Sequence, residues 1–74
     1  MKPDQFGVNE DTRPDEAVKL AMERERKARE FYLRCAGVVH DPGVKKMFEF
    51  LAKEEGRHFD LLEKEYDRFI AQEG

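Results

Sequence analysis

Two stretches of the chain carry apolar residues at helical spacing, and a short polar segment separates them. The first stretch covers about residues 13–39 and the second about residues 42–72, and neither shows the strict alternation of a β-strand. The apolar positions are Val18, Ala21, Met22, Ala28, Phe31, Tyr32, Cys35, Val38, Val39, Val44, Met47, Phe48, Leu51, Ala52, Leu61, Leu62, Tyr66 and Phe69. The pattern therefore predicts an all-α protein with two helices.

Helix-start signals precede both stretches. Thr12 suits the N-cap of the first helix and Pro14 its first turn. In the segment that separates the stretches, Asp41 suits the N-cap of the second helix and Pro42 its first position. So short a connection makes the two helices antiparallel neighbours, and we expect a helical hairpin over residues 12–74.

The first eleven residues differ from the rest of the chain. They are polar, contain Pro3 and Gly7, and show no periodicity. We expect residues 1–11 to form a flexible N-terminal arm.

Size and composition limit how such a hairpin becomes stable. The chain has 74 residues, of which 42% are charged and 39% hydrophobic. A chain this short buries only about 60% of its unfolded surface. Its single cysteine, Cys35, cannot form an internal disulfide. A metal or a second chain is the remaining source of stability, and we expect two hairpins to dimerise into a four-helix bundle.

Charge and hydropathy exclude several classes of function. The net charge is −3 with both signs interspersed, so no basic surface for nucleic acid is expected. No apolar run approaches the length of a membrane span, and the first ten residues lack the apolar region of a signal peptide. These features predict a cytoplasmic protein that binds neither nucleic acid nor membranes.

Three polar residues interrupt the apolar stripes of the two helices. Glu25 lies on the first stripe, and Glu55 and His58 lie on the second, three residues apart on one helix face. Glu25 and Glu55 are about equally far from the turn near residue 40, which places them at similar height in the hairpin. Carboxylates in a core are usually paired, protonated or bound to metal. We therefore consider the three residues a candidate metal site. The alternatives are a solvated groove lined by these residues, or ion pairs to Arg57 or Lys53.

Dimerisation would double this set of ligands. Two copies of Glu25, Glu55 and His58 supply four carboxylates and two imidazoles, whose formal charge two divalent cations would balance. Two Glu and two Glu-x-x-His pairs form the ligand set of ferritin-like dinuclear sites. Mixed oxygen and imidazole ligands suit iron or manganese.

Two longer motifs resemble the ligand helices of rubrerythrin-like ferritins. ERKAREFY at residues 25–32 is similar to Glu-x-x-Ala-x-x-x-Tyr, and MFEFLAKEEGRH at residues 47–58 is similar to Leu-Ala-x-Glu-Glu-x-x-His. The resemblance covers about residues 15–70. Because the chain holds two helices rather than four, it is similar to the encapsulated ferritins, whose two-helix subunits build a ferroxidase centre across a dimer interface inside encapsulin shells.

The resemblance implies a role for each matching residue. Glu25 would be a terminal iron ligand, Glu55 a bridging carboxylate and His58 the imidazole ligand, with two iron ions in each dimer. Tyr32 would orient a ligating carboxylate through a hydrogen bond from its hydroxyl group, without binding the metal itself. The implied activity is oxidation of Fe(II) to Fe(III) for iron storage or detoxification. The resemblance also implies assembly into dimers or larger rings, with an encapsulin nanocompartment as a candidate location.

The sequence departs from the encapsulated ferritins at two places. Arg24 and Lys27 replace the acidic residues beside the first ligand, and the chain ends in Ala71–Gly74 rather than in an apolar targeting tail. Two other functions remain open. One is a rubrerythrin-like peroxide reductase with an electron donor in trans, and the other is a non-enzymatic helical dimerisation module.

Overall fold

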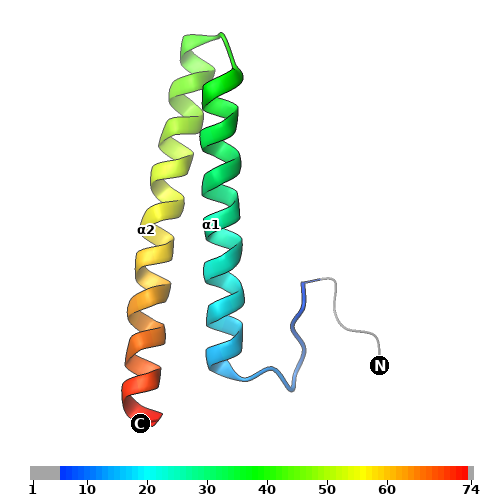
Figure 1. Cartoon of the computed structure of the whole chain (residues 1–74), viewed down its shortest axis with the longest axis vertical. Coiled ribbons are helices and arrows are strands. Elements are labelled where there is room, and N and C mark those ends of the chain that lie inside the picture. The colour runs from blue at the N-terminus through cyan, green and yellow to red at the C-terminus, as the bar shows by residue number, and fades with distance from the viewer. Residues whose placement is uncertain (1–5, 74) are drawn as a thin grey trace.

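The computed structural model describes residues 6–73, which contain two helices and no strand. Helix α1 covers Pro14–Val38 and helix α2 covers Pro42–Glu73, and they lie side by side and antiparallel (Figure 1). These bounds differ by one residue from the predicted bounds at three of the four helix ends. The predicted all-α hairpin is confirmed.

The start of α1 differs from the prediction. Arg13, not Thr12, is the N-cap residue, and its side chain makes no capping hydrogen bond. Thr12 instead closes a turn with Asn9: its Oγ1 accepts a hydrogen bond from the Asn9 N–H at 2.8 Å, and its own N–H donates to the Asn9 carbonyl at 3.1 Å. Because this turn already uses the hydroxyl, Pro14 begins the helix without a side-chain cap.

The start of α2 follows the prediction. The Asp41 Oδ1 accepts a hydrogen bond from the Val44 N–H at 2.8 Å, and Pro42 occupies the first helical position. Helix α1 ends where the Val39 N–H donates to the Cys35 carbonyl at 3.1 Å. The connection is therefore only residues 39–41, which holds the two helices in a fixed antiparallel pairing.

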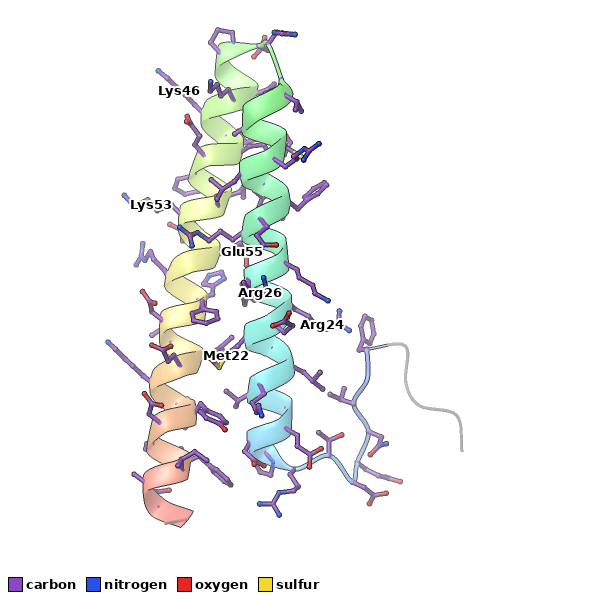
Figure 2. The ribbon with its side chains drawn as sticks, in the orientation of Figure 1. Met22, Arg24, Arg26, Lys46, Lys53 and Glu55 are labelled. Carbon is purple, nitrogen blue, oxygen red and sulfur yellow. The ribbon has the colours of Figure 1, made fainter. Side chains whose placement is uncertain are left out.

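The described part of the N-terminal segment lies against α1 (Figure 2). The Arg24 guanidinium lies 5.3 Å from the centre of the Phe6 ring, and its Nη2 donates to the Phe6 carbonyl at 2.9 Å. Gly7 takes a φ of +80°, a value that favours glycine. Residues 1–5 of the expected flexible arm lie outside the described residues.

The hairpin is a single layer with a very small buried core. Its Cα atoms span 12 Å in the shortest direction, about the diameter of one helix. Among the described residues only Ala36 and Ala52 are buried, at 5% and 2% exposure. The Tyr32 ring stacks on Phe48 across the helix pair, with centroids 6.1 Å apart. Packing between α1 and α2 therefore leaves the larger side chains only partly covered.

The half-buried seam divides the surface into two faces. Successive residues are rotated by about 100° around the helix axis. In two antiparallel helices, residues that are rotated from the seam in the same sense lie on the same side of the helix pair. Six of the ten exposed large hydrophobic residues lie on one side: Leu20, Phe31, Val38, Met47, Phe50 and Leu61. We call this side the apolar face. The other side, which carries Arg26, Arg29, Lys53, Gly56 and Asp60, we call the basic face.

Over residues 6–73, neither helix combines the length and apolar character that crossing a membrane requires.

Candidate metal centre

The short connection places Glu25 and Glu55 opposite each other. Glu25 precedes the last residue of α1 by thirteen positions, and Glu55 follows the first residue of α2 by thirteen. At about 1.5 Å of rise per residue, both lie about 20 Å from the turn. The predicted match in height is therefore a consequence of the helix bounds.

His58 completes a cluster with these two carboxylates. Its Nδ1 lies 3.4 Å from the Glu25 Oε2 and 3.9 Å from the Glu55 Oε2. One ligand atom from each of the three residues lies within 4.8 Å of the others. Two atoms that each lie about 2.1 Å from the same cation are roughly 3 to 4 Å apart. The spacing therefore suits a shared metal ion.

Glu25 has an oxygen that no protein group satisfies. Its Oε2 is buried, yet it makes no hydrogen bond with any described residue, because the His58 Nδ1 at 3.4 Å does not meet hydrogen-bond geometry. Leaving a buried polar atom unpaired costs about 1–3 kcal/mol, and more for a charged group. A cation bound between Glu25, Glu55 and His58 would remove this cost, so the residues present fit a metal ion.

His58 lies at the edge of the seam rather than on the apolar stripe, where the sequence pattern placed it. Its side chain is 53% exposed, whereas Phe59 is half-buried. Relative to Glu55, position 58 is turned by about −60° and position 59 by about +40°, so Phe59 lies nearer the seam. The imidazole is thus the member of the cluster that opens onto the apolar face.

Tyr32 is not brought to the cluster. Its ring packs against Phe48 and Phe31, with centroids 6.1 and 5.8 Å away, and its hydroxyl makes no hydrogen bond within the described chain. A hydrogen bond from Tyr32 to a carboxylate therefore stays a prediction that a single hairpin does not fulfil.

The alternative of ion pairs to neighbouring cations is not observed for the clustered carboxylates. Arg57 pairs with Glu54, with its Nη1 3.4 Å from the Glu54 Oε1. Over residues 6–73, neither Arg57 nor Lys53 forms an ion pair with Glu25 or Glu55. The two clustered carboxylates therefore have His58 as their nearest partner of potentially opposite charge.

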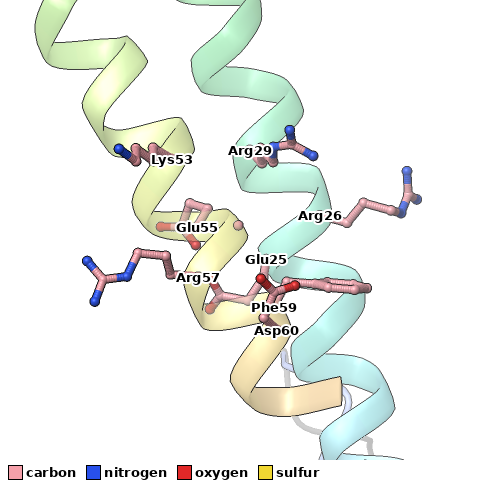
Figure 3. Close-up of a pocket in the computed structure, with 9 residues that line it drawn as sticks. Glu25, Arg26, Arg29, Lys53, Glu55, Arg57, Phe59 and Asp60 are labelled. Atoms are coloured by element: carbon pink, nitrogen blue, oxygen red, sulfur yellow. The ribbon is translucent and has the colours of Figure 1, made fainter. Parts of the chain in front are cut away.

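A pocket of about 520 Å³ opens on the other side of the carboxylates (Figure 3). It is lined by Glu25, Arg26, Arg29, Lys53, Glu55, Gly56, Arg57, Phe59 and Asp60, and His58 is not among them. Sequence reasoning did not identify this pocket, because its cations resemble those of an ordinary solvated helix face. The available signal was a glycine in the middle of a long helix, where it costs about 1 kcal/mol relative to alanine.

A two-helix unit that presents two glutamates and a histidine at one height carries half of the ligand set of a ferritin-like dinuclear bundle. The model of the Rubrerythrin family matches residues 5–69, and the chain therefore belongs to the Rubrerythrin family. This family typically binds iron and is generally related to oxidoreductases, which indicates a di-iron, ferritin-like protein. Searches of curated proteins and of solved structures return no significant match.

Proposed function

We propose that two copies of this hairpin pack through their apolar faces into a four-helix bundle that oxidises Fe(II) to Fe(III). The observation that carries the proposal is the buried Glu25 Oε2, which makes no hydrogen bond within the described chain and lies beside Glu55 and the His58 Nδ1. Three ligands from one hairpin leave room in the coordination shell of an iron ion. A second hairpin at the apolar face, onto which His58 opens, would supply the rest.

The exposed surface supports this assembly. A standard protein interface removes about 800 Å² from each partner. The six exposed residues of the apolar face supply large hydrophobic side chains for such an interface.

The ligand set balances charge across the dimer. Two copies of the cluster bring four carboxylates and two imidazoles together, and two Fe(II) ions match the four negative charges. Carboxylate oxygens favour Fe(III) over Fe(II) because they are hard, anionic ligands, so Glu25 and Glu55 would lower the free-energy cost of oxidation. The surrounding apolar side chains would keep water from the reacting ions.

Iron is the substrate in this proposal. Each Fe(II) loses one electron, and two of them reduce O₂ with two protons to hydrogen peroxide, so that electrons and atoms balance. Holding two ions at one centre lets both electrons reach the same oxidant.

Anaerobic loading with Fe(II) followed by exposure to air tests the proposal. The parent should develop the absorbance of dinuclear Fe(III), while Glu55→Ala and His58→Ala should lose most of the rate. His40→Ala is the matched control, because His40 lies in the connection between the helices and outside the cluster. If the two ligand variants oxidise iron as fast as the parent, the proposal is wrong. A metal-free protein after aerobic purification with iron would favour the dimerisation module.

Membership of the Rubrerythrin family favours one second candidate, a peroxide reductase that uses the same ligands. Residues 1–74 contain Cys35 as their single cysteine and hold no rubredoxin-type cysteine set, so the electrons for this reaction would come from a donor outside these residues. Turnover with hydrogen peroxide and a reductant, compared with turnover with O₂, separates the two activities.

A further inference from the structure

Four cationic side chains line the pocket on the basic face, and two of them form ion pairs within the described chain. Arg26 forms ion pairs with Glu23 and Glu30, and Arg57 forms one with Glu54. Arg29 and Lys53 form no ion pair or hydrogen bond with any residue of the described chain. They come from α1 and α2 respectively and line the same pocket (Figure 3). Both cations are thus without a partner in the described chain, and their charged ends lie on opposite sides of the pocket.

Gly56 leaves the space into which such a ligand would fit. It lies in the interior of α2 and lines the pocket together with Arg29. A Cβ atom at Gly56 would meet only the Arg29 Nε, at 3.9 Å. The absence of a side chain therefore leaves the Arg29 guanidinium close to the backbone of α2, on the opposite side of Glu55 from His58.

The charge of the pocket depends on Glu25 and Glu55. Arg26 and Arg57 are already paired with carboxylates outside the pocket. The two remaining cations therefore face three carboxylates, those of Glu25, Glu55 and Asp60, which gives a formal charge of −1. When the charges of Glu25 and Glu55 are balanced, this formal charge becomes +1. Guanidinium groups bind tetrahedral oxyanions through paired hydrogen bonds, and an ammonium group binds them as a point charge.

We propose that Arg29 and Lys53 bind an oxyanion of the phosphate class in this pocket, and that it binds more tightly once Glu25 and Glu55 are neutralised. The neutralisation by metal rests on the proposed function, whereas the anion site does not. Linkage makes the coupling reciprocal, so an oxyanion in the pocket would also tighten metal binding at the cluster.

The test uses metal-free protein, so that it does not depend on iron chemistry. Glu25→Gln/Glu55→Gln removes both charges with little change of shape. Titration with inorganic phosphate, followed by calorimetry and ³¹P NMR, should show binding to this variant about fivefold or more tighter than to the parent, the lower range of typical coupling. The single variants Glu25→Gln and Glu55→Gln should change affinity in the same direction, which keeps the test available if the double variant does not fold.

Adding Arg29→Gln/Lys53→Gln to the neutralised variant should abolish the gain. Adding Lys19→Gln/Lys46→Gln instead removes the same number of charges outside the pocket, and it should retain the gain. Methyl phosphate, titrated in parallel, distinguishes a site for phosphomonoesters from one for free phosphate, and binding of either supports the site. Equal losses in the two sets of charge variants, or no gain on neutralising the carboxylates, would overturn the inference. A protein that binds phosphate as expected but does not oxidise iron would contradict only the proposed function.

Discussion

The two faces of the hairpin are built from the same two helices but present opposite chemistry on either side of one pair of carboxylates. The apolar face carries six exposed large hydrophobic residues, and His58 opens onto it. The basic face carries Arg29 and Lys53 around a pocket. Glu25 and Glu55 lie between the faces and are the residues that both sides share.

The two faces of this short chain are suited to different kinds of contact. A surface with many large hydrophobic side chains favours association, whereas a charged surface with an open pocket remains compatible with solvent and small ligands. Glu25 and Glu55 are accessible from both faces. In the two proposals, a second hairpin on the apolar face would complete the coordination of the metal, and the pocket on the basic face would become more positive when the metal binds.

The largest expected effect comes from placing a charge on the apolar face. Leu61 is 65% exposed on that face, and Leu33 is 48% exposed on the basic face. Leu61→Asp should convert a dimer into monomers with reduced helicity, because each buried Leu contributes about 2 kcal/mol and a buried carboxylate opposes association further. Light scattering after size-exclusion chromatography measures the mass. Leu33→Asp is the matched control and should remain dimeric; dissociation by Leu33→Asp alone would reverse the assignment of the two faces.

The next effect concerns the metal that would bind between the faces. Fe(II) or Mn(II) at about 100 times its dissociation constant should stabilise the folded protein by about 2.7 kcal/mol, which corresponds to a rise in Tm of at least about 10 °C for a domain of this size. Removing the metal with a chelator leaves the clustered carboxylates repelling each other. Thermal melts measure the change. Equal midpoints with and without metal would show that Glu25 and Glu55 do not hold a cation.

A smaller effect is expected on the basic face. Gly56→Ala should stabilise the protein by about 1 kcal/mol, because alanine favours the helix interior. The new methyl group would meet only the Arg29 Nε, at ordinary contact distance. Urea unfolding measures the gain. A destabilised Gly56→Ala protein would indicate that another chain covers the basic face in the assembly.

The smallest effect comes from ion pairs on the helix surfaces. Hydrogen bonds from Arg26 and Arg68 hold the pKa values of Glu23 and Glu65, respectively, below the ordinary value of 4.5. Because the pKa is lower in the folded state, each pair adds stability above pH 4.5 and loses it as the pH falls through the folded-state pKa. Arg26→Gln and Arg68→Gln should each lower Tm slightly at pH 7, and this difference should shrink as the pH falls below 4.5. A larger effect of Arg68→Gln at pH 7 would indicate that its pair is covered in the dimer.

Periodicity and helix-start signals were enough to predict the hairpin. Asp41 and Pro42 define the turn because their preferences are local, and the turn then sets the heights of Glu25 and Glu55. The signal at Thr12 failed because a competing turn with Asn9 uses the same hydroxyl. A stripe assigned by spacing cannot separate position 58 from position 59, since both lie within 60° of Glu55.

The candidate site was predictable in part for a similar reason. Glu25, Glu55 and His58 stand out because they replace apolar residues on a regular pattern, and the structure brings their ligand atoms together. Arg29 and Lys53 do not occupy positions where the periodic pattern expects an apolar residue, so the sequence does not distinguish them from ordinary solvated charges. Only the arrangement in space shows that they share a pocket with the carboxylates.

The very small buried core has a consequence for the behaviour of the protein in solution. Within the described residues, Ala36 and Ala52 are the only side chains that one hairpin buries. When a chain gains its core from a second copy, folding and association become one equilibrium that depends on protein concentration. Dilution would then unfold the helices and disrupt the metal centre together. The fraction of the protein that can bind iron would therefore depend on the protein concentration.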